Sequence, residues 1–311
     1  MNFRECAKLL REHDDYLILT HHNPDGDTLA SAAALCSALR RAGKTARLYP
    51  NPGLTRAMRP YVERYEAPAD RQPALTVAVD VATEGLFAKG YEGEVFLCID
   101  HHPTNTHYAQ HELIRDTRSS CGEIVLDLIK SLCGDVTKEE ATLLYIAVTT
   151  DTGCFQYANT DYHTLAAASE LLRLGAEGHT VARDFFRKVS PARMKLEGLI
   201  YTGMEFYREG RLVLATVTQD MLRESGATED DFDDLAGLSG RAAGSEMNLT
   251  IRELENGDCK VSVRSAPGVS SVAIAAAFGG GGHEMAAGCT ITAGPEKAKE
   301  LLLAVIDELW P

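Results

Sequence analysis

The sequence predicts an α/β protein: a parallel-sheet N-terminal domain, a linking helix and a smaller α+β C-terminal domain. Over residues 16–175, short apolar runs alternate with helical patterns, which is typical of a parallel sheet covered by helices. Beyond about residue 190, alternating apolar and polar runs follow one another and the helices stand apart. The expected boundaries are 1–187 for the first domain, 188–206 for the helical linker and 207–311 for the second domain.

In the first domain, each expected strand is a short apolar run that ends at a polar or turn residue. A helix is expected over 28–43, with Gly43 as its C-terminal stop. The proline-rich stretch 50–73 is expected to be a loop with one short helix. The expected strands cover 16–20, 46–50, 75–80 and 94–100, and further helices cover 120–133, 138–150 and 162–175.

The second domain is expected to follow a connecting helix over 190–207, which Ser190 and Pro191 open. Three runs with strand alternation come next, and the chain closes with a helical pattern. These segments are 211–218, 246–254 and 259–265 for the strands, a glycine-rich stretch over 270–288, and a final helix over 295–310.

The composition is that of a soluble globular protein, with 45% hydrophobic and 24% charged residues. The net charge of −14 argues against a protein that coats long nucleic acid, because such binding neutralises many phosphates with Lys and Arg. A short nucleotide or a bound dication is compatible with it. No signal segment or membrane-length run is expected, and eight scattered cysteines favour a reducing cytoplasm.

The stretch HHNPDGD, over residues 21–27, lies between an expected strand and an expected helix. Doubly wound folds bind ligands at such positions. His21, Asp25 and Asp27 within seven residues favour a metal site over the alternative, in which Asp27 only caps the following helix.

Further polar residues follow other apolar elements. Asp80 ends LTVAVD, Asp100, His101 and His102 end another apolar run, and Asp151 follows an apolar helix. Taken alone, Asp80 or Asp151 reads as a turn residue or a helix stop. The carboxyl ends of parallel strands share one edge, so we expect these side chains to converge with the first cluster. Clustered carboxylates repel unless cations lie between them, which predicts Mn²⁺ or Mg²⁺ ions, most simply two.

A fifth cluster lies in the second domain, where Arg264 precedes the run Gly279–Gly282 and His283. Glycines allow close backbone approach and can present N–H groups to a phosphate. The run is not a P-loop, because no Lys-Ser/Thr pair follows it. The alternative is a flexible turn before a helix.

In this order, the motifs resemble those of the DHH phosphoesterases. HHNPDGD, the Asp of AVD, DHH and TDTG resemble the four motifs of that family, and VSVRS…FGGGGHEMAAG is similar to its DHH-associated C-terminal domain. Length and domain pairing most resemble the bifunctional oligoribonuclease and pAp phosphatase (NrnA-like) type. The resemblance implies a two-metal hydrolase, in which a metal-bound hydroxide cleaves short oligoribonucleotides (nanoRNA), dinucleotides such as pApA, or pAp.

The resemblance also implies a role for each matching residue. His21 and Asp25 would hold one ion, Asp27 and His101 the other, and Asp80 and Asp151 would contact both. The implied catalytic residues are His102, which would approach the scissile phosphate, and Asp100, which would orient the histidines. The implied substrate contacts, in a cleft between the domains, are Arg264, Ser265, Gly280, Gly281, Gly282 and His283.

The chain departs from the family pattern at two places: Ala30-Ser31 stands where Gly-Ser is frequent, and no arginine follows Asp80 closely. Three alternatives stay open. A cyclic-dinucleotide phosphodiesterase shares these motifs, and a family II pyrophosphatase shares HxNPD and DHH but typically lacks GGGGHxxAAG. A non-catalytic nucleotide-binding module would be expected to lose ligands. A cytoplasmic homodimer without membrane association is a further expectation.

Overall fold

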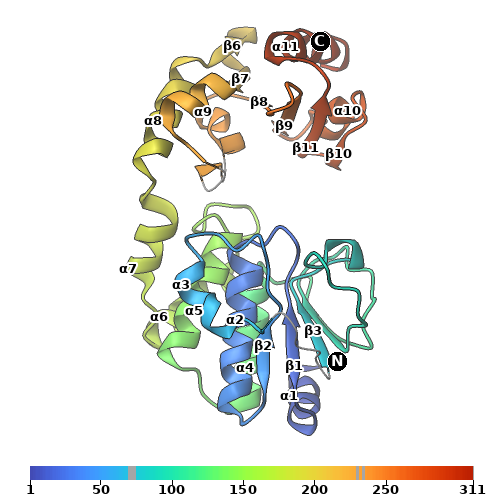
Figure 1. The fold of residues 1–311 in the computed structure, drawn as a ribbon, viewed down its shortest axis with the longest axis vertical. Helices are drawn as coiled ribbons and strands as arrows, with labels where there is room; N and C mark the ends of the chain where they lie inside the picture. The colour runs from blue at the N-terminus through green and yellow to red at the C-terminus, as the bar shows by residue number, and fades with distance from the viewer. Residues whose placement is uncertain (69–74, 229–230, 233–234, 311) are drawn as a thin grey trace. The chain divides into compact units, whose positions relative to one another are not determined.

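The computed structural model describes residues 1–68, 75–228, 231–232 and 235–310, and it divides into two compact units, Met1–Lys188 and Val189–Pro311 (Figure 1). The last five residues of the loop expected over 50–73 lie outside the described residues. In its first part this stretch contains the short helix α3, Arg59–Val62, and a 3₁₀ turn, Glu63–Tyr65.

The first unit is built on a five-stranded sheet in the order β2-β1-β3-β4-β5, and every neighbouring pair is parallel. The parallel sheet that the sequence predicts is therefore confirmed. One strand, β5, was not expected, because HELI has too few apolar residues to stand out. The strands are β1 Tyr16–Leu19, β2 Ala46–Leu48, β3 Leu75–Val79, β4 Leu97–Asp100 and β5 His111–Ile114.

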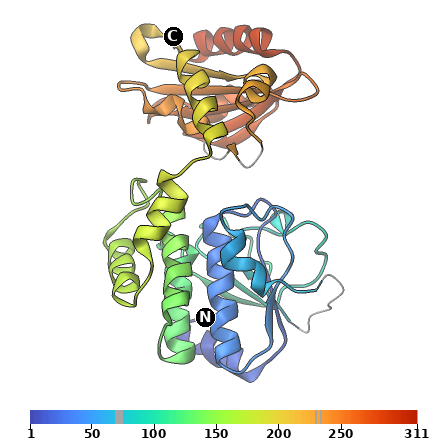
Figure 2. The same cartoon turned by 60° about the vertical axis from the view of Figure 1, so that its left-hand side comes forward.

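The helices of the first unit include two neighbours, α2 (blue) and α5 (green), that lie side by side in Figure 2. Helix α2 begins at Gly26, two residues before the expected start, and Gly43 follows its end with φ +82° as a left-handed stop. The bounds are α1 Phe3–Glu12, α2 Gly26–Arg41, α4 Cys121–Cys133, α5 Lys138–Asp151, α6 Tyr162–Arg173 and α7 Gly178–Val181, and a π-helical turn covers Ala182–Arg187.

The two faces of this sheet are covered differently. Val77 and Val79 point into the large core that the helices complete, whereas Ala78 points to the opposite face. There it packs in a smaller cluster with Val81 and Val95, which aromatic residues of the loops after β3 and β4 cover. The apolar faces are therefore covered, and the polar residues that follow β1, β3 and β4 lie at the carboxyl edge of the sheet.

The second unit contains a six-stranded mixed sheet in the order β10-β11-β9-β8-β7-β6, in which only β7 and β8 pair in parallel. The strands are β6 Glu205–Tyr207, β7 Leu212–Val217, β8 Met247–Glu253, β9 Cys259–Ser265, β10 Gly281–His283 and β11 Ala286–Ile291. The helices are α8 Pro191–Thr202, α9 Gln219–Ser225, α10 Ser271–Ala276 and α11 Pro295–Leu309.

The helix expected over 190–207 is shorter than predicted. Helix α8 ends at Thr202, and the residues after Met204 form the edge strand β6. Leu196 and Ile200 of α8 are buried with Ala215 and Val217 of β7, so this helix packs on the second unit. Helices α10 and α11 cover the other face of the same sheet.

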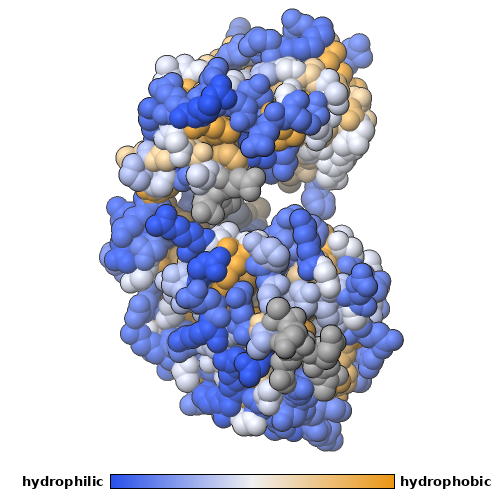
Figure 3. Space-filling model, in the orientation of Figure 1, coloured by the Kyte–Doolittle hydropathy of each residue, from blue (hydrophilic) through white to orange (hydrophobic). Residues whose placement is uncertain are grey.

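The face in Figure 3 is mostly hydrophilic, with small scattered hydrophobic patches, in line with the net charge of −14. No helix among the described residues is both long and apolar enough for a membrane span. All eight cysteines are free thiols.

Candidate active site

The first unit gathers the predicted ligands at the carboxyl edge of its sheet. His21 and Asp80 follow β1 and β3, and His101 follows β4 directly. The start of α2 and the end of α5 bring further carboxylates to the same edge, because Asp151 is the last residue of α5. Potential ligand atoms gather within 4.8 Å in three overlapping groups: His21, Asp25 and Asp80; Asp27, His101 and Asp151; and Asp80, His101 and His102.

The first two groups are separate, and Asp80 connects them. His21 Nε2 lies 3.7 Å from Asp25 Oδ1 and 3.8 Å from Asp80 Oδ2. His101 Nε2 lies 3.9 Å from Asp27 Oδ2 and 3.7 Å from Asp151 Oδ2. The other oxygen of Asp80, Oδ1, lies 3.4 Å from His101 Nε2. One carboxylate thus faces both groups, with one oxygen toward each.

Asp25 and Asp27 accept hydrogen bonds from different donors although they are two residues apart. Asp25 caps α2, because its Oδ1 accepts a hydrogen bond of 3.0 Å from the Thr28 N–H. Asp27 is 1% exposed and accepts bonds from Ser31 Oγ (2.9 Å) and from the first two amides of α4, Cys121 N (2.7 Å) and Gly122 N (3.0 Å). The alternative interpretation, in which Asp27 only caps the following helix, is therefore wrong. The residue that caps this helix is Asp25.

Close packing of α2 on α5 holds these carboxylates near Asp151. A Cβ on Gly26 would lie 2.4 Å from Thr150 Oγ1, so only glycine fits at this contact. Gly122, at the start of α4, is equally constrained, because a Cβ there would lie 2.6 Å from the Ala147 Cβ of α5. The three helices therefore meet at glycines beside the candidate ligands.

His101 is oriented by a backbone carbonyl. Its Nδ1 lies 3.2 Å from the Arg118 carbonyl oxygen, which accepts a hydrogen bond only when Nδ1 carries the proton. The lone pair of the neutral ring is then on Nε2, the atom that faces the carboxylates of Asp80, Asp27 and Asp151. Ligand histidines in metal sites usually have such a hydrogen-bonded second nitrogen.

His102 has another environment. Its Nδ1 lies 2.8 Å from Asp100 Oδ1, and its side chain is 40% exposed. Asp100 is fully buried, and its second oxygen accepts a bond of 2.6 Å from Asn105 Nδ2. The hydrogen bond to Asp100 outweighs burial and raises the pKa of His102. Asp100 thus orients the His102 ring, while it contacts His101 only through the backbone N–H, at 2.8 Å.

Asp80 is strained and incompletely bonded. Its φ of +61° lies in the left-handed region, which is uncommon for a residue other than glycine. Its side chain is 3% exposed, and within the described part of the chain Oδ1 has no hydrogen-bond partner. A buried oxygen without a partner is costly. A cation at this point would satisfy it.

The pKa shifts of the clustered side chains also indicate a cation site. Burial and the neighbouring carboxylates Asp80 and Asp151 raise the pKa of Asp27 well above its usual range. Burial is also the main cause that raises the pKa of Asp151 to about 7. For His101, burial favours the neutral ring, but Asp80, Asp27 and Asp151 outweigh it and raise the pKa to about 10. Without cations, Asp27 and Asp151 therefore tend to hold protons instead.

The residues present fit divalent ions that prefer oxygen and imidazole ligands. The donor set is four carboxylates and two imidazoles without a thiolate, which suits Mn²⁺ or Mg²⁺ rather than structural Zn²⁺. Neighbouring ligand atoms of one octahedral ion lie about 3 Å apart. The closest approaches here, 3.4–3.9 Å, would need only a small contraction.

In the second unit, Arg264 and His283 lie in one row across three strands. Arg264 of β9 pairs with Ala286 of β11, and Ala286 pairs with His283 of β10. Directly opposed residues share a face, so the two backbone positions are about 10 Å apart on the same side. Both residues are exposed, and helices α10 and α11 cover the other face.

Most glycines of the run Gly279–Gly282 are needed for the backbone packing of β10 and the turn before it, which the sequence does not indicate. The N–H groups of Gly279 and Gly280 donate to the carbonyls of Ala276 and Ala275, and are therefore engaged. A Cβ on Gly280 would lie 2.2 Å from Gly288 O, and one on Gly282 would lie 2.6 Å from Ala286 O. Gly281 is exposed, and a Cβ there would have no neighbour within 4 Å in the described residues.

Ser265 lies apart from this row. Its hydroxyl contacts Val269 O at 2.6 Å and Ser271 Oγ at 2.8 Å. Neighbouring strand residues alternate in direction, so Ser265 points away from the Arg264 face. The structure therefore does not bring this hydroxyl together with Arg264 and His283.

Sequence reasoning missed the residues that support the ligands. Ser31 and Asn105 lie inside the motif regions, at Asp27 + 4 and Asp100 + 5, but a Ser or Asn there has no distinctive pattern. Asn51 binds the His21 carbonyl at 2.8 Å, and Asn159 binds the Asp151 carbonyl at 3.1 Å. These amides act through the backbone carbonyls of residues 30 and 8 positions away in the sequence, and only the structure reveals such contacts.

Comparison with known proteins agrees with this architecture. The family "DHH family, N-terminal domain" matches residues 15–148, and "DHHA1 domain" matches residues 210–310. The chain is 37% identical to the bifunctional oligoribonuclease and PAP phosphatase NrnA of Thermus thermophilus, covering 88% of this chain and 83% of the relative. It is 26% identical to a probable enzyme of the same name from Streptococcus mutans, with 92% of each chain covered.

A solved structure, of an exopolyphosphatase-related protein from Bacteroides fragilis, superimposes with a TM-score of 0.86. The alignment covers 98% of this chain and 96% of that one at 22% identity, so this likeness concerns the fold. The two family matches, in the expected order, and the relative at 37% identity over most of the chain confirm the resemblance drawn from the motifs. The chain belongs to the DHH family, with an N-terminal DHH domain and a C-terminal DHHA1 domain.

Proposed function

We propose that the protein is a metal-dependent phosphohydrolase that cleaves short oligoribonucleotides, dinucleotides such as pApA, or pAp. The observation that carries the proposal is the pair of ligand groups that Asp80 joins, with one buried oxygen of Asp80 left without a hydrogen-bond partner among the described residues. The relatives named oligoribonuclease and PAP phosphatase support the substrate class.

In this proposal, the first group would hold one divalent ion and the second group would hold the other, and Asp80 would contribute an oxygen to each. We propose Mn²⁺ as the ion, with Mg²⁺ as the alternative. Both accept carboxylate and imidazole ligands. Two such ions supply stabilisation of the charge on the phosphoryl oxygens and lower the pKa of water. The proposed ligands are His21, Asp25, Asp27, Asp80, His101 and Asp151.

His102 is the proposed catalytic residue, and Asp100 is its positioning partner. Asp100 accepts a hydrogen bond from the Nδ1–H of His102, which fixes the ring and leaves Nε2 free to contact a phosphoryl oxygen or the leaving group. The partial exposure of the ring, 40%, allows this contact. Asn105 holds the other oxygen of Asp100, so that Asp100 cannot turn away.

Arg264, His283 and the open Gly281 are the proposed contacts for the terminal phosphate and nucleotide. Arg264 offers a planar fork of donors, which suits a phosphate. Gly280, Gly282 and Ser265 belong to this proposal as residues that shape β10 and the turn after β9. Assembly as a homodimer is a separate prediction, tested by the mass of the protein in solution.

The experiment that tests the proposal is hydrolysis of pApA by the full chain with Mn²⁺, followed by chromatography. Wild type is expected to release mononucleotide, and Asp80→Asn is expected to retain less than about a thousandth of that rate. Asparagine is chosen because it tolerates the left-handed backbone of Asp80. Asp220→Asn, an exposed carboxylate of the second unit, is the matched control and should be fully active.

Parallel reactions with pAp, cyclic dinucleotide and pyrophosphate separate the alternatives. Fastest cleavage of the cyclic substrate would favour a cyclic-dinucleotide phosphodiesterase, and cleavage of pyrophosphate alone would favour a pyrophosphatase. Binding of pApA without hydrolysis of any substrate would replace the enzyme by a nucleotide-binding module. Equal activity of Asp80→Asn and wild type would refute the assignment of the site.

A further inference from the structure

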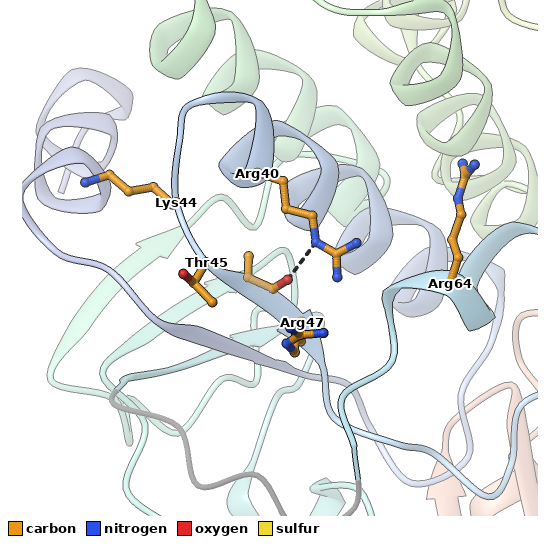
Figure 4. A pocket seen from close by; sticks show the side chains of 6 residues that line it. Arg40, Lys44, Thr45, Arg47 and Arg64 are labelled. Atoms are coloured by element: carbon orange, nitrogen blue, oxygen red, sulfur yellow. Dashed lines mark hydrogen bonds between the residues drawn. The ribbon is translucent and has the colours of Figure 1, made fainter.

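A pocket lined by cationic side chains lies in the first unit, at the opposite end of α2 from the candidate ligands. Arg40 at the end of α2 and Arg47 of β2 line an open pocket of about 330 Å³ (Figure 4). About 13 helical residues separate Arg40 from Asp27, which corresponds to roughly 20 Å along the helix axis. The pocket is therefore separate from the proposed catalytic centre. Its lining residues are Arg40, Lys44, Thr45, Ala46, Arg47 and Arg64.

Two arginine side chains, those of Arg40 and Arg47, line this pocket. Figure 4 shows the side chain of Arg40 extending from α2 toward Arg47 on β2. Arg40 donates only to carbonyl oxygens, at 2.8 Å to Ala46 O and 3.4 Å to Tyr65 O. Arg47 is half-buried, and its Nε is a buried donor that has no partner within the described ranges. A buried N–H without an acceptor is costly unless a ligand supplies one.

The flanking cations Arg64 and Lys44 and the nearby carboxylate of Asp14 are already engaged. Arg64 pairs with Glu139 and stacks over the Tyr65 ring, and Lys44 donates to the Arg11 carbonyl at 2.6 Å. Asp14 accepts bonds from backbone N–H groups, that of Thr45 among them. For the residues that the structure describes, no ion pair of Arg40 or Arg47 with a carboxylate is found.

We propose that this pocket binds the phosphate group of a small phosphorylated ligand. Neither guanidinium fork pairs with a carboxylate among the described residues, although the net charge of the protein is −14. Arginine forks match the geometry of phosphate oxygens. The Thr45 side chain also lines the pocket and can add a hydroxyl donor. The pocket volume suits a phosphate, a pyrophosphate or part of a mononucleotide, and the proposal is independent of the catalytic function.

Hydrogen–deuterium exchange on the full chain with Mn²⁺ tests the proposal, because it separates this pocket from the metal centre. Inorganic pyrophosphate and adenosine 5′-monophosphate are the two probes, and adenosine is the phosphate-free control. Both probes should slow the exchange of backbone amides over 40–48, whereas adenosine should not. If only the nucleotide protects this segment, the ligand is a nucleotide; if both do, the phosphate group alone is sufficient.

Arg47→Gln should raise the probe concentration needed for half-maximal protection about tenfold or more, since it removes a charged fork. Its rate of oligonucleotide hydrolysis should equal that of wild type. Arg47→Lys keeps the charge and should give an intermediate effect, which serves as the test if Arg47→Gln is poorly folded. Arg59→Gln, an exposed cation outside the pocket, should bind as wild type does. Three results would overturn the proposal. The probes could leave the exchange over 40–48 in wild type unchanged, or they could protect both Arg47 variants as well as wild type. Sodium chloride at matched ionic strength could also give the same protection as the probes.

Discussion

At the scale of single residues, the adjacent histidines His101 and His102 differ in the hydrogen bonds of their Nδ1 atoms, and this difference gives them different roles in the proposed site. His101 Nδ1 faces a backbone carbonyl, and its Nε2 faces three carboxylates. His102 Nδ1 faces the buried carboxylate of Asp100. The backbone turn after β4 sends the two rings in different directions, with an angle of 58° between their planes. Adjacent position in the sequence therefore does not mean an equivalent role.

This difference predicts opposite behaviour of two matched variants. His101→Gln should weaken Mn²⁺ binding, because it removes a nitrogen from the second ligand group. His102→Gln should keep the Mn²⁺ content and the Mn²⁺-induced rise in Tm, but lower kcat by about 10²- to 10⁴-fold. Metal analysis, thermal melts and steady-state kinetics measure these effects. Loss of bound Mn²⁺ in His102→Gln would place this residue among the ligands instead.

The proton that Asp151 holds near neutral pH predicts how Mn²⁺ binding depends on pH. Burial raises the pKa of this carboxyl from 3.8 to about 7 in the metal-free protein. Because the folded pKa is raised, its contribution to stability is present below pH 3.8 and is lost as pH rises through about 7. An ion that replaces the proton removes this loss. Mn²⁺ should therefore raise Tm more at pH 7.5 than at pH 5.5.

Thermal melts with Mn²⁺ or with a chelator, at pH 5.5, 6.5 and 7.5, check this expectation. Asp151→Asn, which cannot titrate, is the comparison variant and should show a smaller change of the Mn²⁺ effect with pH. A rise in Tm that is the same at all three pH values in wild type would contradict the assignment.

The motif residues could be recognised from the sequence because ligand chemistry restricts them to His and Asp at the ends of apolar runs. The residues that hold the ligands could not. Ser31 and Asn105 are ordinary polar residues in sequence terms, and Asp27 is anchored by amides 94 and 95 residues further along the chain. The bonds of the Gly279 and Gly280 amides to α10 were also out of reach, since a glycine run does not reveal where its N–H groups point.

At the scale of elements, the contact between α2 and α5 controls the distance between two sets of ligands. Gly26 begins α2 beside Asp25 and Asp27, and Thr150 precedes Asp151 at the end of α5. The backbone of α2 and the Thr150 side chain are so close that no methyl group fits between them. A single methyl group added here would move one helix end, and its carboxylates, relative to the other.

Gly26→Ala is therefore expected to reduce both stability and Mn²⁺ affinity. Overpacking at such a contact costs about 1–3 kcal/mol of the free energy of unfolding. The double variant Gly26→Ala/Thr150→Ala removes the atoms that the new Cβ would meet and should recover most of the loss. Gly43→Ala, with no neighbour near its Cβ position but a φ of +82°, is a control for backbone strain alone. Denaturant unfolding with and without Mn²⁺ measures these effects; a double variant no better than Gly26→Ala would show that the contact is not the cause.

The elements that the sequence predicts best are those with a strong period or a long apolar run. Helices α2, α4, α5, α6 and α11 and strands β1, β3, β4 and β7–β9 fall within or close to the expected ranges. Strands β5, β6 and β10 were missed because edge strands of three or four residues have only one buried face or none. The internal strand β11 was missed because it begins in small residues at the end of the glycine-rich stretch. Their pairing with a neighbouring strand defines them, and pairing is a tertiary property.

At the scale of the whole molecule, the chain has separate apolar cores for its two units. The large core of the first unit and the cluster beneath α10 and α11 share no residue. The candidate metal ligands all lie in the first unit, and Arg264 and His283 lie in the second. The proposed function therefore assigns metal binding and recognition of the substrate's terminal phosphate to different units of the same chain.

This division predicts a clean separation of effects for Arg264. Arg264→Gln should raise KM for pApA about tenfold or more, because a charged fork to a phosphate is lost. The Mn²⁺-induced rise in Tm should stay as in wild type, since no ligand changes. Lys260→Gln, a cation four pairs from Arg264 along β9, is the matched control and should change KM little. If Arg264→Gln also lost Mn²⁺ stabilisation, the second unit would contribute to the metal centre itself, and the assignment of metal binding to the first unit alone would fail.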